Sequence, residues 1–452
     1  MTTVDTFIEK LLRAAAEAGI SPAEVCYAED DSFSARAMEG AIDQYEVSAT
    51  RALGIRGSVD GRMGYASTEA FDDAAVRMLV EAVKESAALA EAEEHDEIFA
   101  GEDTYPTLET PESDIDSVSA EDKLDLLRRI EKAALSTDPR VTKSQGAYIS
   151  TGHGRVRIVN TLGLDLSREA PLGGFVSCGA YVVGRDGDSV VTGNKSFASH
   201  LVREVDPESV GAAAAEDAAS MLHASPVASG VYRAVIRRDA MRSLLATFRG
   251  IFSAENAQQK LSLLGGREGE KIAADCVTLM DDPLLPGGFA SAVFDAEGSA
   301  TRTKAVIDGG VLTTLLHNRK TAAKQGVATT GNASGGMGGA IHVSATNLFF
   351  KPGEKDLPEL LSEMDDGLLI TYFGGLHAGA NPISGDFSLL SSGYLIANGH
   401  IVRPVEQITV AGNFYQLLKN IRAVGSDLEF LGGGIGSPSV DVGAVNVSGA
   451  EG

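Results

Sequence analysis

The stretch GYLIANGHIVRP, residues 393–404, sets the expected fold class of the chain. Two apolar runs flank Asn398-Gly399, and such a pair is a strong signal for a two-residue hairpin turn, because both positions need a positive φ. Short hairpins join antiparallel strands, whereas parallel strands need long crossovers. Further glycine turn signals between strand-like runs occur at Asp60-Gly61, Asp186-Gly187 and Gly309-Gly310. The sequence therefore predicts antiparallel sheets and, with its helical segments, an α+β fold.

The chain divides into four parts by composition and periodicity. Residues 1–92 read as an N-terminal α+β region, and residues 93–118, which are acidic and lack periodicity, read as a linker or surface loop. Residues 119–225 are expected to form a middle α+β region packed with the first. Residues 226–452 are expected to form a larger, β-rich C-terminal domain. Flanking helices should cover the antiparallel sheets.

The composition argues against several classes of partner. The chain has 452 residues, too many for one ordinary core, and a formal net charge of −25. An acidic field repels nucleic acid, so no nucleic-acid partner is expected. No apolar run approaches the roughly 18–20 residues that span a bilayer, so no membrane partner is expected. The N-terminus reads as an amphipathic helix with Asp5 and Glu9 where a signal peptide would be basic, which favours a cytoplasmic protein.

Three cysteines, Cys26, Cys178 and Cys276, lie far apart and form no C-x-x-C motif. An odd number of separated cysteines suits a reducing compartment. Each stands in an apolar, strand-like setting. We therefore expect each to be a buried core thiol and not a metal ligand or nucleophile.

Several familiar catalytic motifs are missing from the sequence. There is no Gly-Lys-Ser/Thr of a P-loop, no G-x-S-x-G nucleophile elbow and no His-Glu pair of a zincin helix. The glycine-rich runs GNASGGMGG (331–339) and LGGGIGSPS (431–439) do not match the dinucleotide-binding fingerprint. They predict tight turns where the backbone comes close to another group.

Two acidic clusters remain as candidate sites. Asp281 and Asp282 precede a proline turn, and Asp295 and Glu297 stand two apart on a strand-like segment, hence on one face. Either pair could hold a cation or an arginine. A charged turn bonded to nearby backbone groups is the favoured interpretation.

The stretch GGLHAGANPISGDFS, residues 374–388, concentrates polar side chains among glycines. A serine such as Ser384 or Ser388 could serve as a nucleophile with His377 and Asp386 if the loop brought them within hydrogen-bond reach. No sequence motif supports this arrangement. A self-sufficient, metal-free hydrolase is therefore an alternative hypothesis.

The C-terminal half carries a long series of motifs. In order they are DDPLLPGG, FDAEG, TKAVIDGGVL, ATTGNA, FGGLHAGANPISGDFS, GYLIANGHIVRPV, ITVAGNF and GSPSVDVGAVNVSG. This series resembles the PmbA/TldD family, whose members were historically called modulators of DNA gyrase and are now regarded as metallopeptidases. VRIVNTLGLDLSRE in the N-terminal half fits as well, so the resemblance covers nearly the whole chain.

In the TldD branch of that family, a helix carries His-Glu-x-x-x-His and a late cysteine completes the zinc site. The resemblance places this helix at residues 240–256, with Ala246 and Thr247 at the first His and the Glu, and Ile251 at the second His. These side chains do not supply the lone pairs that zinc needs, and residues 428–438 contain no cysteine. The resemblance therefore implies the PmbA (TldE) branch, with no cofactor in this chain.

Members of that branch pair with a TldD-type subunit, which brings the zinc. The resemblance implies that the pair encloses a chamber in which an unfolded peptide is held and cut, for proteolysis or peptide maturation. The chain would then be a subunit without catalysis of its own, able to form a homodimer when isolated. A regulatory binding protein with no peptidase partner is the third hypothesis.

A subunit that holds peptides is expected to use backbone groups more than side chains, because an extended peptide can add to an exposed strand edge. Family position and polarity place the candidate peptide contacts in the 374–388 loop. They are Gly375, His377, Asn381 and Asp386, with Gly385 as the hinge of the turn.

Overall fold

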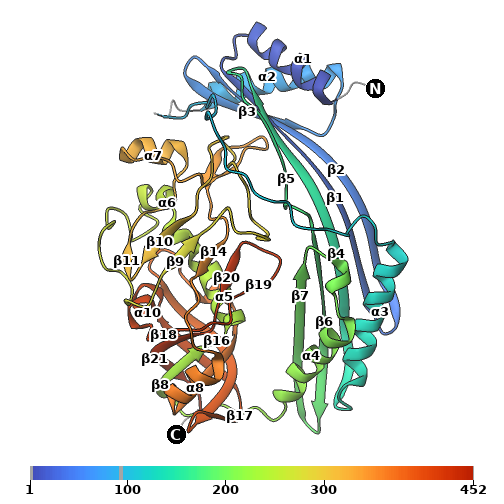
Figure 1. Cartoon of the computed structure of the whole chain (residues 1–452), viewed down its shortest axis with the longest axis vertical. Helices are drawn as coiled ribbons and strands as arrows, with labels where there is room; N and C mark the ends of the chain where they lie inside the picture. The colour runs from blue at the N-terminus through green and yellow to red at the C-terminus, as the bar shows by residue number, and fades with distance from the viewer. Residues whose placement is uncertain (1–3, 91–94, 451–452) are drawn as a thin grey trace.

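Two halves of the chain lie side by side, a tall curved sheet with its helices and a β-rich C-terminal half (Figure 1). The structure is a computed structural model that describes residues 4–90 and 95–450. The expected boundary between residues 92 and 93 therefore lies outside the described residues. Helices flank antiparallel and mixed sheets in both halves, which confirms the predicted α+β class.

The N-terminal half is built on one antiparallel sheet of seven strands. Its order is β3-β2-β1-β4-β6-β7, and β5 pairs with β4. The strands are β1 (Ala23–Met38), β2 (Ala41–Val59), β3 (Arg62–Thr68), β4 (Val141–Asn160), β5 (Asp165–Glu169), β6 (Phe175–Asp186) and β7 (Ser189–Ser199). Since β1 pairs with β4 along most of its length, strands from before and after the 93–118 segment share one sheet.

Helices cover this sheet at its two ends, and each end has its own core. α1 (Val4–Glu17) and α2 (Asp73–Leu89) pack on one end, and α3 (Ala120–Ser136) with α4 (Pro207–Ser220) on the other, next to the short 3₁₀ helix η1 (Val202–Glu204). β4 has 20 residues, so it spans on the order of 65 Å at about 3.3 Å per residue. That length exceeds one small core, which explains the two separate clusters.

The C-terminal half contains a closed five-stranded ring. β17, β16, β15, β8 and β21 follow one another, β17 also pairs with β21, and β18 pairs with β21. These strands are β8 (Gly230–Ile236), β15 (Gly367–Gly374), β16 (Asp386–Ala397), β17 (His400–Asn413), β18 (Ala423–Val424) and β21 (Val440–Ser448). α5 (Arg238–Phe248) shares their core, where Phe248 stacks on Phe414 with ring centroids 4.6 Å apart.

A second sheet of short strands completes this half, in the order β11-β10-β9-β14-β20-β19, beside the hairpin β12-β13. Its strands and the hairpin are β9 (Leu279–Asp281), β10 (Lys304–Asp308), β11 (Val311–Leu312), β12 (Ala333–Gly335), β13 (Ile341–Val343), β14 (Leu348–Phe350), β19 (Glu429–Phe430) and β20 (Ile435–Ser437). The remaining helices are η2 (Arg249–Phe252), α6 (Ala254–Gln258), α7 (Arg319–Gln325), α8 (Leu357–Met364), α9 (Leu376–Gly379) and α10 (Phe414–Asn420).

The hairpin turns form where the sequence predicts them. Asp60 and Gly61 have φ angles of 51° and 76° between β2 and β3. Asn398 and Gly399 have φ angles of 50° and 74° between β16 and β17. Two consecutive positive φ angles are typical of the type I′ turn, whose twist matches that of the strands it joins. Local turn chemistry thus fixes both pairings.

The segment 95–118 carries turns but no helix or strand. It crosses from the α2 end of the sheet to α3 (Figure 1) and bonds to the C-terminal half on the way. Tyr105 Oη donates to the Gly298 carbonyl at 2.8 Å, and Glu102 accepts from the Ala300 amide at 3.0 Å. The segment is therefore an ordered strap across the junction of the halves.

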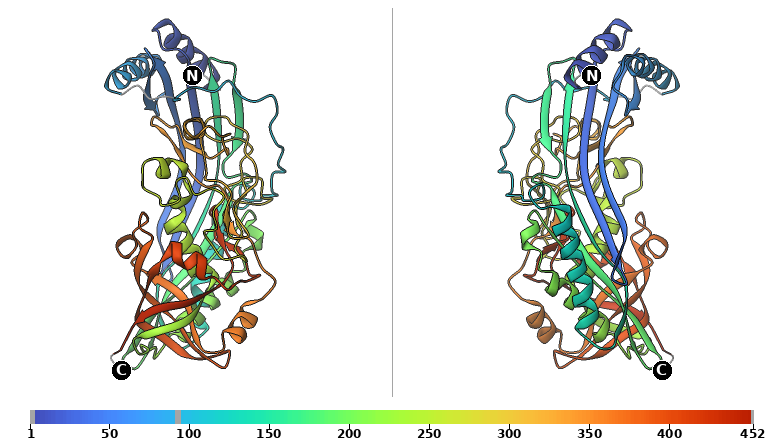
Figure 2. Two further views of the ribbon diagram at one scale, coloured as in Figure 1. Left: turned by 90° about the vertical axis from the view of Figure 1, so that its left-hand side faces the viewer. Right: turned by 90° about the vertical axis from the view of Figure 1, so that its right-hand side faces the viewer.

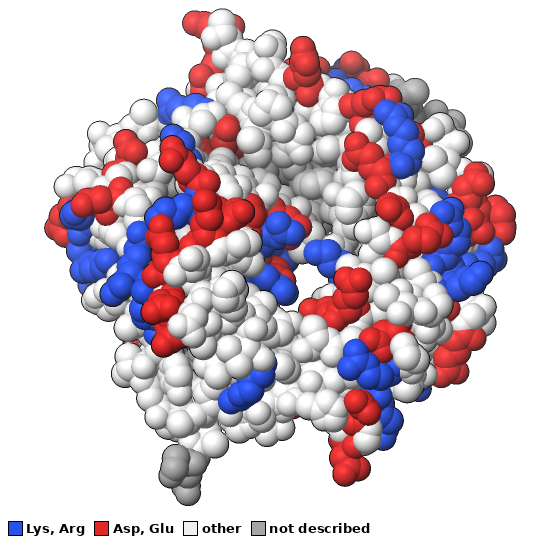
Figure 3. Space-filling view, turned by 60° about the horizontal axis from the view of Figure 1, so that its bottom comes forward, with Lys and Arg blue, Asp and Glu red and all other residues white. Residues whose placement is uncertain are grey.

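A second contact lies at the closed five-stranded ring of the C-terminal half. There Arg403 Nη1 on β17 donates to the carbonyl and the hydroxyl of Ser225, which follows α4, both at 2.7 Å. α1 and α2 project beyond the C-terminal half at the opposite end of the sheet (Figure 2). Figure 3 shows an opening between the halves on one face, with Lys or Arg and Asp or Glu at its margin. Within the described ranges, no helix combines the length and the apolar character needed to cross a bilayer.

Candidate functional site

The 374–388 loop is held by hydrogen bonds between its own residues. Gly375, with φ of 73°, begins α9, and Gly385, with φ of 80°, precedes β16. Asn381 Oδ1 accepts from the amides of Ile383 at 2.9 Å and Ser384 at 3.2 Å. The Asn381 amide in turn donates to the carbonyl of Asp386 at 2.8 Å. These bonds organise the loop without any ligand.

Asp386 is exposed, but its carboxylate is oriented by two neighbours. Asn413 Nδ2 donates to Asp386 Oδ1 at 2.9 Å. This bond, followed by a smaller contribution from Ser384, lowers the pKa of Asp386. Asp386 is thus an ionised group at the start of β16, suited to receiving a hydrogen bond.

The loop does not assemble a catalytic triad. His377, Asn381 and Asp386 are all exposed. Among the described residues, no hydrogen bond joins His377 to Asp386 or to a serine of the loop, and Ser384 Oγ instead accepts from the Asp386 amide at 3.3 Å. Four of the five candidate peptide contacts are exposed, Gly385 is buried, and their binding role stays a prediction.

The helix expected over residues 240–256 is shorter than predicted. α5 ends at Phe248, a 3₁₀ turn covers Arg249–Phe252, and α6 begins after the N-cap Ser253. Gly250, a poor helix former, lies at the break, and its carbonyl accepts from Asn256 Nδ2 at 2.8 Å. The sequence pattern indicated neither the end of α5 at Phe248 nor the start of α6 after Ser253.

The three positions of the metal motif hold side chains with other roles. Ala246 offers only a methyl group, Thr247 Oγ1 donates to the Ser243 carbonyl at 2.9 Å, and Ile251 lies in the hydrophobic core with 1% exposure. In the part of the chain that the structure describes, no group of three or more His, Cys, Asp or Glu residues is placed to hold a metal ion.

The first acidic cluster is a buried structural network. Asp281 is fully buried and pairs with Lys304 Nζ at 2.9 Å. It also accepts from Asn332 Nδ2 at 2.8 Å and from the amide of Thr346 at 2.7 Å. Asp282 accepts from the Leu284 amide at 3.0 Å, as the turn interpretation predicts. The carboxylate oxygens are therefore engaged by the protein itself.

The second acidic cluster lies in a turn and not, as expected, on a strand. Asp295 accepts from the amides of Glu297, Ser299 and Ala333 at 2.9 to 3.0 Å. Glu297 accepts from the Arg319 amide at 2.8 Å. The turn replaces a strand because Gly298 adopts a φ of 77° and Asp295 bonds the amides that follow it. The expected bonding to backbone groups is confirmed.

Burial perturbs both carboxyl groups of this turn. It raises the pKa of Asp295 to about 6, against the lowering effect of its three amide bonds. It raises the pKa of Glu297 to about 7, and the neighbouring Asp295 adds to the rise. Arg56 and Arg319 act in the opposite direction on Glu297. The junction of the halves therefore contains two carboxyl groups that burial drives toward the neutral form.

The cysteine expectation holds for two residues and is wrong for the third. Cys26 on β1 and Cys178 on β6 are buried, and burial raises the pKa of their thiols to about 11 and about 12. Cys276 is exposed, because the chain turns at Asp275 and Cys276 while Val277 points inward. Apolar neighbours alone did not show this turn.

The glycine-rich runs mark close approaches between backbones, as predicted. A Cβ on Gly54 of β2 would lie 2.4 Å from the amide nitrogen of Gly338, which belongs to the 331–339 run. In the other run, a Cβ on Gly434 would lie 2.3 Å from the Thr346 carbonyl. The first contact seats the β12-β13 loop directly on the N-terminal sheet.

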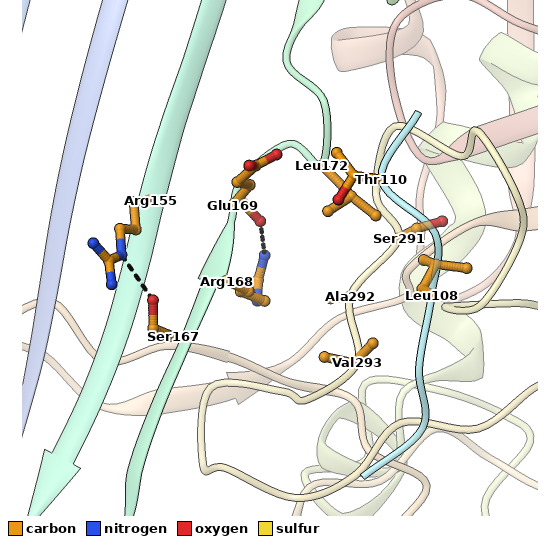
Figure 4. Close-up of a pocket in the computed structure, with 10 residues that line it drawn as sticks. All are labelled: Leu108, Thr110, Arg155, Ser167, Arg168, Glu169, Leu172, Ser291, Ala292 and Val293. Atoms are coloured by element: carbon orange, nitrogen blue, oxygen red, sulfur yellow. Dashed lines mark hydrogen bonds between the residues drawn. The ribbon is translucent and has the colours of Figure 1, made fainter. Parts of the chain in front are cut away.

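A cavity of about 460 Å³ lies between the N-terminal sheet and the C-terminal half (Figure 4). β4, β5 and the turn after β5 contribute its first wall, the 95–118 strap its second wall, and residues 291–293 its third. In that order, the named residues are Arg155, Ser167, Arg168, Glu169, Leu172, Leu108, Thr110, Ser291, Ala292 and Val293. Its place between the halves makes it a natural binding site.

A second cavity of about 220 Å³ adjoins the first, since Arg168 and Ala292 line both. Its walls include Cys26 on the sheet, and Asp295 and Ser334 on the C-terminal half. Arg168 thus stands between two spaces that run along the junction of the halves.

Arg168 is a partly buried cation with few partners. Its Nε has no hydrogen-bond partner within the described residues, and Nη1 donates to the Glu169 carbonyl at 3.3 Å. Its guanidinium lies over the Phe294 ring, 5.6 Å from the centroid. Burial lowers the pKa of Arg168. No sequence motif marks this residue, although Leu164, Leu166 and Arg168 alternate toward one face, a pattern that indicates an inward arginine.

The chain is similar to proteins of one family along most of its length. Residues 229–449 match the C-terminal domain of the PmbA/TldA metallopeptidases, residues 113–222 their central domain and residues 23–87 their domain 1. Metalloprotease PmbA of Escherichia coli O157:H7 is 27% identical over 90% of this chain and 88% of its own length. The PmbA homolog of Haemophilus influenzae is 29% identical over 92% and 89%.

Solved structures show the same likeness. A Thermotoga maritima protein described as a modulator of a DNA gyrase superposes with a TM-score of 0.90 at 33% identity, covering 99% of this chain and 100% of its own. TldE from Thermococcus kodakarensis superposes with a TM-score of 0.87 at 22% identity, covering 98% of this chain and 100% of its own. The latter likeness shows a shared fold.

Proposed function

The chain belongs to the PmbA/TldD metallopeptidase family, and from this premise we propose that it is a subunit that holds unfolded peptides for a zinc-bearing, TldD-type partner. The observation that carries the proposal is the chemistry of α5 and η2. By the resemblance to the TldD branch, Ala246, Thr247 and Ile251 of these elements correspond to two zinc ligands and a general base. Their side chains do not fit a zinc ion, so no catalytic step through a metal follows for them.

The space between the halves supports the peptide-holding part of the proposal. Two adjoining cavities lie there, walled by the sheet, the 95–118 strap and the C-terminal half. β7 ends the sheet on the side that faces the C-terminal half (Figure 1). An edge strand offers main-chain groups to an extended peptide with little sequence preference, which suits a holder of unfolded chains.

Reconstitution tests the proposal. The chain is purified alone and its zinc content measured, and then cleavage of an unfolded test protein is followed with and without a TldD-type partner. We expect no stoichiometric zinc in the isolated chain and cleavage only with the partner, abolished by a chelator. Stoichiometric zinc, or chelator-sensitive cleavage by the chain alone, would overturn the proposal.

The same experiment separates the two other hypotheses. Chelator-resistant cleavage by the isolated chain that is lost in His377→Ala would favour the metal-free hydrolase, for which the loop geometry gives no support. Failure of any TldD-type partner to bind would favour a regulatory binding protein. A homodimer of the isolated chain and a cytoplasmic location stay predictions, and light scattering of the purified chain tests the first.

A further inference from the structure

The larger cavity between the halves holds more positive than negative charge. Arg155 and Arg168 line it together with one carboxylate, Glu169. The Glu169 side chain accepts from the Gly173 amide at 3.0 Å, and in Figure 4 it points away from Arg168. Arg155 Nε donates to Ser167 Oγ at 2.7 Å, which fixes the two polar groups side by side.

Arg168 is the unusual member of this set. In the described part of the chain it has no ion pair, and its Nε is buried without a hydrogen bond. A buried guanidinium normally pairs with a carboxylate, because removing the charge from water is costly. The nearby Asp295 is already occupied by three backbone amides. A guanidinium whose buried Nε has no hydrogen bond, at the wall of a cavity, is available to bind an anionic group.

We infer that this cavity binds a carboxylate carried by a peptide, either its C-terminal carboxylate or an Asp or Glu side chain, with Arg168 as the main anchor. The inference rests on the proposed peptide-holding function and adds a recognition element to it. Arginine suits the role because its planar fork donates two parallel hydrogen bonds to a carboxylate.

The charge of the site favours a monoanion over a phosphate. Two arginines and one glutamate leave about one positive charge in the cavity, and a dianion would meet repulsion from Glu169 and from a chain of net charge −25. The acidic surface also disfavours nonspecific anion binding. Selectivity for a carboxylate must therefore come from local contacts, and the apolar Leu108, Leu172 and Val293 supply walls for the adjoining residue.

Binding of defined peptides to the purified full chain tests the inference. Three fluorescent, unstructured peptides of about 12 residues are built on one parent sequence without Asp or Glu, in which the third peptide replaces one residue by Glu. The first has a free C-terminal carboxylate, the second a C-terminal amide, and the third an amide with one internal Glu. By fluorescence anisotropy we expect the amide to bind roughly 10- to 100-fold more weakly than the carboxylate, the range expected for a buried charge-assisted hydrogen bond. The third peptide shows whether a side-chain carboxylate can substitute.

Arg168→Gln should abolish the difference between the carboxylate and the amide, and Arg168→Lys should restore part of it. Arg185→Gln is the matched control. Arg185 lies exposed on β6, and its substitution removes the same charge as Arg168→Gln. The comparison of peptides on the unmodified chain needs no variant, so a folding defect cannot obscure it. Equal affinity for all three peptides overturns the inference while leaving the peptide-holding function intact. Absence of binding to any of them overturns both.

Discussion

Glu297 is a residue at which we expect the stability of the junction to depend on pH. It is 4% exposed, and the charged groups near it are Asp295 in the same turn, Arg56 on β2 and Arg319 on α7. Burial raises its pKa from 4.5 to about 7. A carboxyl group whose pKa is raised on folding binds more protons in the folded than in the unfolded state. Its contribution to stability is therefore present in full below the unfolded pKa and lost as the pH rises through about 7.

Glu297→Gln should consequently become more stable relative to the unmodified chain as the pH rises from 5 to 8. The glutamine keeps an oxygen that can accept from the Arg319 amide and carries no charge to bury. A rise from 4.5 to about 7 corresponds to at most about 3 kcal/mol, and loss of attraction to Arg56 reduces this. Thermal unfolding at the two pH values measures the difference, with the exposed Glu109→Gln as control. A difference that shrinks toward pH 8 would contradict the argument.

For single residues, the sequence predicts those contacts that are made with residues nearby in the chain. The backbone bonding of Asp282 and Asp295 follows from Asp placed before a turn, and both were expected. Arg168 acquires its setting from residues 291–294, more than 120 positions away, so no local pattern could name its partners. The exposure of Cys276 likewise depends on where a turn falls within an apolar stretch.

Among the elements, β2 and the loop between β12 and β13 approach each other closely at Gly54. A Cβ there would meet Gly338 N at 2.4 Å and Gly336 O at 2.7 Å. These are backbone atoms, which cannot rotate away as a side chain can. β2 belongs to the N-terminal half and the loop to the C-terminal half. The two halves can therefore come this close only because residue 54 has no side chain.

Gly54→Ala should push the loop off the sheet and destabilise the protein by about 1–3 kcal/mol, the usual effect of overpacking. We expect a lower Tm and faster hydrogen exchange in residues 335–339. Gly339→Ala is the control, because a Cβ at Gly339 meets nothing within 4 Å and its backbone is not left-handed. If both substitutions leave Tm and exchange unchanged, the close contact does not hold the loop.

How well an element is predicted depends on what ends it. Type I′ hairpins end by local chemistry, so the turns at Asp60-Gly61 and Asn398-Gly399 were predicted to the residue. α5 ends where Gly250 and the N-cap Ser253 compete with an apolar periodicity that continues through the break. The resemblance placed one helix over 240–256, and periodicity gave no sign of the break because it reports which face is buried and not whether the helix is continuous.

The whole molecule is an arch of two halves joined in separate places with cavities between them. The strap bonds to the C-terminal half through Tyr105 and Gly298. The five-stranded ring bonds to the segment that follows α4 through Arg403 and Ser225. Turn signals and periodicity predicted the classes of element in each half. They could not predict the arch, because the joining contacts link residues 178 or 193 positions apart.

Arg403 provides the test of this arrangement. Its guanidinium donates to the carbonyl and hydroxyl of Ser225 at 2.7 Å and to the Pro226 carbonyl at 3.1 Å. Arg403→Ala removes these partly buried, charge-assisted bonds and should lower the free energy of unfolding by about 1–2 kcal/mol. Because the strap is a separate joint, hydrogen exchange should quicken in residues 220–226 and 394–404 and stay slow in residues 295–300. The exposed Arg185→Ala on β6 controls for the lost charge. Exchange that quickens equally at both joints would show that the halves separate as one cooperative unit, and the idea of two independent joints would then be wrong.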